Sequence, residues 1–291
     1  MTQVVTLLNT TWNQPVAAGE QEFAIDALER GCVLLFPHLG FPMQAGEAQF
    51  LSPAVAGKGK NVSLDPATGV LRGSSVEGAE LPLLQGMLMR YATSSRRLMR
   101  ELFPHYESGL KQARTSFRPV EIAGRQISWR KDDTRLHVDS FPSSPTQGTR
   151  ILRVFVNINP QGQSRSWRLG EAFDDVARRY LPQARAPFLG EDRALHWLGI
   201  TKRRRTAYDH YMLQLHDRMK ADMAYQAGAK QLSFEFPAGC TWMVYTDLAS
   251  HAAMSGQHAL EQTFHLPVSS MRYPERTPLR VLEKLLGKAL A

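Results

Sequence analysis

The stretch Leu232–Tyr245, with the sequence LSFEFPAGCTWMVY, gives the clearest indication of the fold class of this 291-residue chain. Its first five residues alternate apolar and polar side chains, which is the period-two pattern of an antiparallel strand with one buried face, and the predicted strand is Gln231–Phe236. Its last five residues, from Thr241 onward, have the composition of a second strand. Pro237, Ala238 and Gly239 lie between the two and predict the turn of a hairpin.

Other short runs have strand character, and several longer runs show the spacing of apolar residues that is typical of helices. The predicted strands outside the opening stretch are Cys32–Phe36, Val120–Ile122, Gln126–Trp129, Ile151–Ile158 and Leu260–Val268. The predicted helices are Ala18–Arg30, Leu81–Leu102, Gly170–Tyr180, Tyr208–Ala227 and Leu279–Leu290. Residues 52–78 are rich in Gly, Ser, Pro and Lys and predict a long surface loop. The expected fold is mainly β with flanking helices, in the α+β class.

The net charge of +8 favours a polyanionic partner, such as nucleic acid, anionic lipid, or a phosphorylated or carboxylated substrate. The densest basic run is Lys202–Arg205, for which a solvated approach to the next helix is an equally good interpretation. The predicted C-terminal helix is amphipathic and basic. Packing against the domain is favoured for it over docking on an anionic membrane surface.

Two further features bear on the location of the chain. No segment has the roughly 18 consecutive apolar residues that a membrane span needs, and the N-terminus lacks the pattern of a signal peptide. Cys32 and Cys240 are far apart and form no CxxC pair, so neither a disulfide framework nor a zinc site is indicated. The expected location is the cytoplasm.

The pair His137 and Asp139 has the His-x-Asp spacing that supplies two ligands of a 2-His-1-carboxylate facial triad. Residues i and i+2 of an extended segment point to the same face, so both side chains can project into one barrel. The third ligand is expected after a later strand, where His251 follows the predicted strand at 241–245. Three protein ligands on one face of iron leave positions open for a bidentate 2-oxo acid and for O2.

Other interpretations of these residues remain open at this point. A His-x-Asp pair is frequent by chance, so His137 and Asp139 also fit an exposed polar turn. His251 also fits a half-buried histidine hydrogen-bonded to Asp247. His258 and His265 compete with His251 as the third ligand, but they lie just before and inside the last predicted strand and rank below it.

Two long segments resemble a known family. The segments are HVDSFPS at 137–143, continuing to RILRVFVNINP at 150–160, and SHAAMSGQHALEQTF at 250–264. They are similar to the bacterial hydroxylases of 3-deoxy-D-manno-octulosonic acid (Kdo), and the likeness covers most of the chain. The resemblance implies a double-stranded β-helix, or jelly roll, and an Fe(II)/2-oxoglutarate-dependent dioxygenase that hydroxylates C3 of Kdo on lipid A of lipopolysaccharide. It also implies that the metal ligands are His137, Asp139 and His251.

The residue patterns and the resemblance together predict the following organisation and partners. Residues 1–291 are expected to form a single oxygenase domain, with a helical N-terminal scaffold at 1–115, a jelly-roll core at 116–270, a helical insert at 170–230 and a C-terminal amphipathic helix at 276–291. The implied cofactor is Fe(II), with 2-oxoglutarate and O2 as co-substrates and succinate and CO2 as products. The implied partner is Kdo-lipid A, with peripheral contact to an anionic membrane, at the inner face of the bacterial inner membrane. No nucleic acid is expected.

The cation that would bind the far carboxylate of 2-oxoglutarate is not evident, because Glu261 and Gln262 stand where many such oxygenases have an arginine. An arginine is preferred because its planar fork binds a carboxylate through two hydrogen bonds. The candidates are Arg118, Arg150, Arg153 and Arg165, the last acting together with Trp167. Arg150 and Arg153 differ by three positions, so they are expected on opposite faces of one strand.

Two alternative functions stay open. A related 2-oxoglutarate oxygenase could act on another substrate, namely a small metabolite, a nucleic acid or a protein side chain. A jelly-roll module without redox chemistry could instead bind anionic lipid or nucleic acid through its basic residues. Substitution of His137 and Asp139 by Ala separates the classes, because only an oxygenase would lose iron and turnover.

Overall fold

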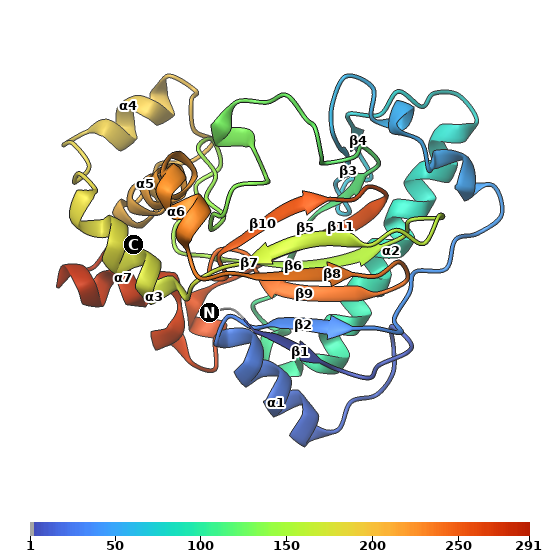
Figure 1. Cartoon of the computed structure of the whole chain (residues 1–291), viewed down its shortest axis with the longest axis horizontal. Coiled ribbons are helices and arrows are strands. Elements are labelled where there is room, and N and C mark those ends of the chain that lie inside the picture. Colours follow the sequence, from blue (N-terminus) through green and yellow to red (C-terminus); the bar gives the residue numbers. More distant parts are fainter. Residues whose placement is uncertain (1–2) are drawn as a thin grey trace.

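Two β-sheets form the centre of the computed structural model, which describes residues 3–291 (Figure 1). The large sheet has the order β1 (Val4–Thr6), β2 (Val33–Phe36), β9 (Thr241–Tyr245), β6 (Arg150–Asn157), β11 (Ala259–Leu266), β5 (Lys111–Arg118), β3 (Val62–Leu64) and β4 (Leu71–Arg72). The small sheet has the order β10 (His251–Ser255), β7 (Arg165–Leu169) and β8 (Leu232–Phe236). Apart from the parallel pair β1–β2, the strands pair antiparallel. This is the expected double-stranded β-helix core with flanking helices.

Aromatic side chains fill the space between the two sheets. Trp242 of β9 stacks on Phe236 of β8, with ring centroids 4.2 Å apart, and on Phe155 of β6 at 5.1 Å. Trp167 of β7 meets Trp242 edge-on at 5.7 Å. These residues alternate with outward-facing positions along their strands, so one face of each sheet is apolar. This packing places β7 opposite β6, because Trp167 of β7 contacts Phe155 of β6.

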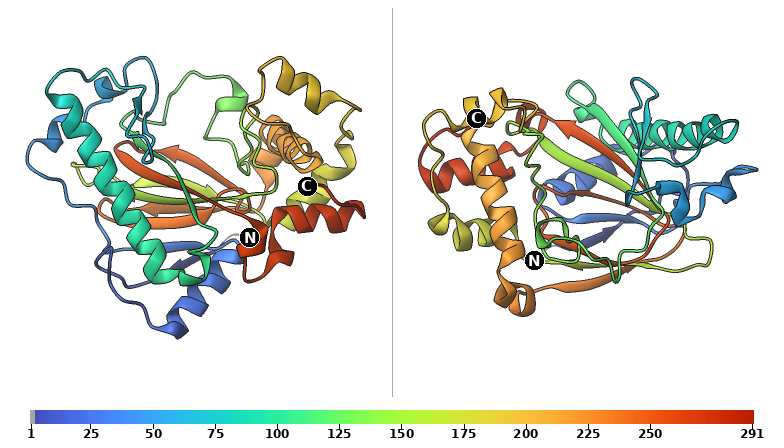
Figure 2. Two further views of the ribbon diagram at one scale, coloured as in Figure 1. Left: turned by 180° about the vertical axis from the view of Figure 1, so that it is seen from behind. Right: turned by 90° about the horizontal axis from the view of Figure 1, so that it is seen from above.

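Two helices cover the outer face of the large sheet. They are α1 (Ala18–Glu29) and α2 (Glu80–Leu102), and Figure 2 shows α2 lying across the back of the sheet. The buried residues of α2 recur at three- and four-residue spacing, among them Leu84, Met87, Leu88 and Tyr91. Tyr91 also donates a hydrogen bond from its hydroxyl to the carbonyl of Val154 in β6, at 2.9 Å. The polar end of this large side chain is therefore satisfied inside the core.

The remaining helices gather at one end of the sheets (Figure 1). They are α3 (Phe173–Tyr180), α4 (Glu191–Trp197), α5 (Ala207–Ala221), α6 (Met223–Gly228) and α7 (Pro278–Leu286). The helix predicted at 208–227 is divided in two, because Asp222 ends α5 and its side chain accepts the backbone N–H of Tyr225 to begin α6. In α7, Leu279 and Leu282 are buried in the main core.

The structure corrects several predictions from the sequence. The turn Pro237–Gly239 is not a hairpin turn, because β8 pairs with β7 while β9 pairs with β2 and β6, so this turn carries the chain from one sheet to the other. The runs Val120–Ile122 and Gln126–Trp129 are not strands; the guanidinium of Arg125 binds the carbonyls of Val120 and Glu121 and holds a compact loop there. The segment expected to be a surface loop at 52–78 contains β3 and β4.

Strands also occur where none was predicted. They are β1, β5, β7 and β10, in addition to β3 and β4. None of the helices in residues 3–291 combines the length and the apolar composition that crossing a bilayer requires.

Candidate metal centre and active site

The segment that contains His137 and Asp139 is extended and lies against the strand β10. The backbone groups of His137 and His251 exchange two hydrogen bonds, at 3.0 and 2.9 Å, in an isolated antiparallel bridge. Leu136 and Val138 are buried in the main core, so the alternate residues of this segment point to the opposite side. The i, i+2 spacing therefore places His137 and Asp139 on one face, as predicted.

The three predicted ligands converge. Within residues 3–291, His137, Asp139 and His251 each offer one donor atom, and all three atoms lie within 4.8 Å of one another. His137 Nε2 is 3.6 Å from Asp139 Oδ1. The Nδ1 atom of His137 is 2.7 Å from the carbonyl oxygen of Arg135, and the Nδ1 atom of His251 is 2.8 Å from that of Ala249. Each Nδ1 is thereby occupied as a donor, which leaves both Nε2 atoms free to bind a cation.

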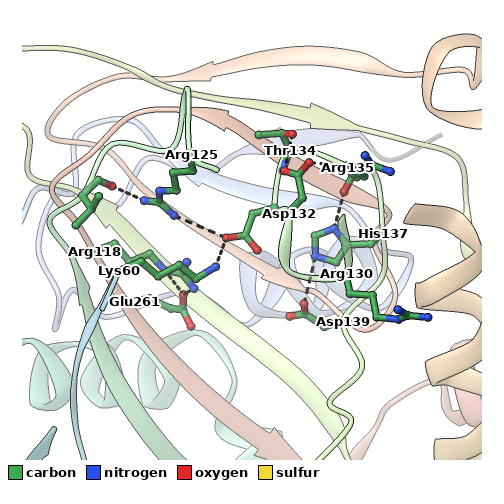
Figure 3. A network of polar contacts seen from close by, with 12 residues as sticks. Lys60, Arg118, Arg125, Arg130, Asp132, Thr134, Arg135, His137, Asp139 and Glu261 are labelled. Carbon is green, nitrogen blue, oxygen red and sulfur yellow. Dashed lines mark hydrogen bonds and ion pairs between the residues drawn. The ribbon is translucent and has the colours of Figure 1, made fainter. Parts of the chain in front are cut away.

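Figure 3 shows His137 between the carboxylate of Asp139 on one side and the backbone of Arg135 on the other. The side chain of Asp247 is not a partner of His251, contrary to the alternative drawn from the sequence; Arg150 binds it instead. His258 and His265 are not part of the cluster of donors found in residues 3–291. His251 is therefore the histidine that joins the other two donors.

The electrostatics of the centre keep the donors in the form that a metal requires. Burial lowers the pKa of His137 to about 3 and also lowers the pKa of His251. Burial alone would raise the pKa of Asp139, but the charge of Arg153 and the contact with His137 hold that pKa well below its usual value. At neutral pH the centre consists of two neutral imidazoles and one carboxylate, ready to bind a divalent cation without first releasing a proton.

A chain of charged groups supports Asp139 from β6 and β11. Arg153 Nη2 is 2.7 Å from Asp139 Oδ2, and Arg153 Nη1 is 2.9 Å from Glu261 Oε1. Arg118 of β5 binds the other oxygen of Glu261, with its Nε at 2.8 Å. Figure 3 shows Arg118 and Glu261 side by side next to Lys60, which pairs with Asp133 at 2.6 Å. Glu261 therefore binds two arginines and orients the one that holds Asp139.

The five residues considered for 2-oxoglutarate have different surroundings. Arg150 is buried away from the centre, with its Nε 2.6 Å from Asp247 Oδ2 and its guanidinium over the ring of Tyr245. Arg118 and Arg153 are bound to carboxylates, as described above. Arg150 and Arg153 point to opposite faces of β6, as their spacing predicted.

Arg165 differs from the other three arginines because no carboxylate of residues 3–291 lies within ion-pair distance of it. It is buried, it donates one hydrogen bond from Nη1 to the carbonyl of Gly256, and its Nε has no partner in the described chain. Burial and the nearby charges of Arg118 and Arg125 lower the pKa of Arg165 to about 9. A buried guanidinium in this position lacks an anion.

Trp167 lies two residues from Arg165 on the same buried face of β7. Its ring is stacked on the imidazole of His251, with centroids 5.2 Å apart and an interplanar angle of 23°. The indole Nε1 has no hydrogen-bond partner within residues 3–291. The shared parity predicted for Arg165 and Trp167 is thus observed, and it places Arg165 on the strand face whose Trp167 ring lies against His251.

A cleft of about 460 Å³ is lined in part by the loop that follows Asp139, although none of the three donors lines it. Its basic lining comes from β5 and from the run before α5, namely Lys111, Arg114, Lys202 and Arg203; Phe141, Thr263 and His265 are among its other lining residues. Thr263 is the cross-strand neighbour of Arg153, and the ring of Phe141 is 5.8 Å from the Arg153 guanidinium carbon. Two lining residues of the cleft are therefore neighbours of Arg153, which pairs with Asp139. Sequence reasoning missed Lys111 and Arg114, because β5 was not predicted.

The comparisons with known proteins identify the family. The family described as 3-deoxy-D-manno-oct-2-ulosonic acid (Kdo) hydroxylase matches residues 11–289. This chain belongs to the Kdo hydroxylase family. No match was found among the curated proteins.

Solved structures of the Kdo hydroxylase KdoO are similar over the whole fold. KdoO, a non-heme Fe(II) alphaketoglutarate-dependent dioxygenase, in complex with alphaketoglutarate and Fe(III), is 50% identical, with a TM-score of 0.97 over 100% of this chain and 98% of that chain. KdoO in complex with succinate and Fe(III) is also 50% identical, with a TM-score of 0.96 over 99% of this chain and 97% of that one. Alphaketoglutarate is another name for 2-oxoglutarate.

The residues of this Kdo hydroxylase family member fit such a metal. Two neutral imidazoles and one carboxylate on one side of a cation match the 2-His-1-carboxylate set of non-heme Fe(II) oxygenases. The backbone hydrogen bonds of both histidines and the ion pair of Asp139 provide the outer contacts that orient such ligands.

Proposed function

We propose that this chain hydroxylates C3 of the Kdo sugar on lipid A, with Fe(II) held by His137, Asp139 and His251. The observation that carries the proposal is the convergence of these three donors within 4.8 Å, in a member of the Kdo hydroxylase family. When bound there, Fe(II) with O2 and 2-oxoglutarate supplies the oxidising chemistry: one oxygen atom enters the C–H bond of the sugar, and 2-oxoglutarate leaves as succinate and CO2.

We assign the far carboxylate of 2-oxoglutarate to Arg165. Its buried guanidinium lacks an anion, it has an unpartnered Nε, and Trp167 of the same strand face touches His251. A carboxylate would accept charge-assisted hydrogen bonds from it in a water-poor site, where such bonds are strong. Arg118 lies near enough to add to the local positive charge, but Glu261 already neutralises it.

The 460 Å³ cleft is the proposed site for the acceptor sugar. Kdo is a carboxylate carried on a phosphorylated glycolipid, so it suits a cleft with four basic side chains. Phe141 and Thr263 connect this cleft to Arg153 and so to Asp139. The sugar would be positioned beside the metal, while its charged groups remain on the basic wall.

We further propose that residues 1–291 act as one oxygenase domain. Strands β1 and β2, from the N-terminal part, extend the same sheet that contains β6, β9 and β11. Because the acceptor is a glycolipid, we also propose that the chain works in peripheral contact with an anionic membrane surface.

The deciding experiment is reconstitution without oxygen, followed by a single turnover. Purified chain, Fe(II) and 2-oxoglutarate are expected to give the weak visible charge-transfer band of the chelate. Admission of O2 with Kdo-lipid A is expected to give one succinate for each oxygen atom gained by the lipid. A band without oxidised Kdo-lipid A would leave an oxygenase with another substrate, and a folded chain that gives no band would refute the metal assignment.

A further inference from the structure

An exposed arm at residues 186–205 contains many of the apolar side chains that the protein leaves in contact with solvent. This α4 arm comprises the turn before α4, the helix itself and the basic run Lys202–Arg205. In Figure 1 and in the left view of Figure 2, α4 lies at the outer edge of the molecule. Of the eleven large apolar side chains exposed in residues 3–291, five are on the arm: Phe188 (68% exposed), Leu189 (107%), Trp197 (85%), Leu198 (61%) and Ile200 (50%).

The arm is not held by the core in the way that the other helices are. None of the seven residues of α4 is buried. The hydrogen bonds of the arm are largely internal, such as those from the backbone of Ile200 and Thr201 to the carbonyl of Leu195. Such a concentration of exposed apolar side chains on one short segment indicates an interaction surface, because scattered single residues are the usual condition of a soluble surface.

Positive charge surrounds these apolar side chains. From Arg185 to Arg205 the chain has six basic and two acidic residues, a net charge of +4. The two acidic residues are already paired, Asp192 with Arg204 at 2.6 Å and Glu191 with Arg185 at 3.5 Å. Arg193, Lys202 and Arg203 have no ion-pair partner among the described residues. An apolar surface bordered by unneutralised cations is complementary to an anionic lipid surface. The apolar side chains are buried at the membrane interface, and the cations are attracted to the lipid charges.

The arm is connected to the proposed acceptor cleft. Lys202 and Arg203 belong both to the arm and to the wall of that cleft. The backbone N–H of Lys202 donates to the carbonyl of Ser143 at 2.9 Å, and Arg205 donates to the carbonyl of Pro142 at 2.6 Å. Both carbonyls lie in the loop that follows Asp139. The side chains that would meet a membrane therefore lie next to the cleft that would receive a sugar from it.

We propose that the α4 arm binds the surface of an anionic bilayer, with Trp197 and Leu198 inserted at the level of the headgroups and Lys202 and Arg203 against lipid phosphates. This inference rests on the proposed function, since it explains how a soluble fold reaches a glycolipid acceptor. The predicted alternative, the C-terminal helix, is a poorer surface because Leu279 and Leu282 are packed in the core.

The test is co-sedimentation of the full chain with vesicles of phosphatidylcholine, with and without phosphatidylglycerol. The variant combines Trp197→Ser with Leu198→Ser, and the matched control is Phe23→Ser, an exposed apolar residue of α1 (49% exposed). Wild type and control are expected to bind the anionic vesicles and not the neutral ones. The double variant is expected to lose vesicle binding by on the order of tenfold or more, because buried apolar groups supply much of such affinity.

Two results would overturn the inference. One is equal vesicle binding by the double variant and the wild type. The other is a wild type that does not bind vesicles but forms a dimer, while the double variant is monomeric. The arm would then contact a second copy of the chain. The iron chelate band of the double variant, measured without vesicles, is expected to match that of the wild type and also shows that it is folded. Absence of the band in the wild type would refute the proposed function, whereas vesicle binding is measured independently of it.

Discussion

At the scale of single residues, each proposed metal donor is oriented by one defined outer contact. The imidazoles of His137 and His251 are fixed through Nδ1 by carbonyl oxygens, and Asp139 is fixed by Arg153. Such contacts select the tautomer and the direction of each donor before any cation arrives. Trp167 adds a stacking contact that limits rotation of the His251 ring.

We expect His251→Ala to abolish formation of the iron chelate band. The change removes one of three protein ligands, and loss of an outer contact alone typically weakens metal binding by about 10- to 100-fold. Titration of the anaerobic protein with Fe(II) is the measurement. His265→Ala is the control, since His265 lines the cleft outside the cluster of donors; equal iron loss in both variants would contradict the assignment.

Arg165→Gln is expected to raise the KM for 2-oxoglutarate by on the order of 10- to 100-fold, because the carboxylate would lose charge-assisted hydrogen bonds worth about 1.5–3 kcal/mol. The KM for the acceptor should change little. Arg114→Gln, in the acceptor cleft, is the matched control and should show the reverse. Steady-state succinate release measures both constants, and an unchanged KM for 2-oxoglutarate in Arg165→Gln would exclude this residue as the anchor.

At the scale of elements, the ligand segment depends on a helix for its backbone hydrogen bonds. Gln226 of α6 accepts the N–H of Leu136 at 2.8 Å and donates to the carbonyl of Leu136 at 3.0 Å. One side chain therefore replaces a neighbouring strand at the residue just before His137. This explains why the insert between β7 and β8 contributes to a metal centre built from the sheets.

We expect Gln226→Leu to reduce iron affinity by about 10- to 100-fold, as loss of an outer contact to a metal site usually does. The change leaves two buried backbone groups of Leu136 unpaired, each at a cost of about 1–3 kcal/mol of unfolding free energy. Anaerobic Fe(II) titration and thermal unfolding are the measurements. Gln183→Leu, at an exposed position of the same insert, should leave iron affinity as in wild type.

The register of β11 with β5 and β6 places Glu261 between two arginines. Burial would raise the pKa of Glu261, but Arg118 and Arg153 lower it below its ordinary value. Since the pKa of Glu261 is lower in the folded than in the unfolded state, its ion pairs with the two arginines stabilise the fold at pH values above the unfolded pKa of about 4.3. This contribution is lost as the pH falls below that value toward the folded pKa.

Glu261→Gln is therefore expected to destabilise the protein at pH 7 by about 3 kcal/mol, the usual result of removing one partner of a buried ion pair. As the pH falls below about 4.3, the stability of the variant should fall less steeply than that of the wild type. Urea unfolding at several pH values measures both effects. Glu235→Gln, on an exposed position of β8, is the control. Parallel pH profiles for Glu261→Gln and wild type would contradict this account.

At the scale of the whole molecule, the chain carries a net charge of +8, and some of its basic side chains serve two proposed surfaces at once. The proposed acceptor cleft and the α4 arm share Lys202 and Arg203. A basic surface attracts an anionic glycolipid over a distance set by the ionic strength, about 8 Å at physiological salt and about 3 Å at 1 M.

We therefore expect the KM for Kdo-lipid A to rise with salt, while the KM for 2-oxoglutarate changes much less because Arg165 is buried. Initial rates over a series of NaCl concentrations measure both. Arg114→Gln should reduce the salt dependence for the lipid. A salt response that is the same for both substrates would show that the cleft charges do not select the acceptor.

Much of the fold, and the shared face of two of the proposed metal donors, could be predicted from the sequence, because both depend on short-range periodicity. The two-residue spacing of His137 and Asp139 places them on one face of any extended segment, and the apolar patterns of β6, β9 and α2 give their approximate bounds. The prediction of a hairpin at Pro237–Gly239 was wrong because strand pairing depends on long-range contacts. A turn signal shows that the chain bends but not which sheet the next strand joins.

The sequence by itself determined the class of the protein, its strand-forming core and the triad of His137, Asp139 and His251 as candidates for iron. Only the tertiary structure decided that Arg165 lacks an anion while Arg150, Arg118 and Arg153 are bound to carboxylates. All four arginines look alike along the chain. Their differences arise because burial and charge pairing depend on residues that are far apart in sequence, which only packing brings together.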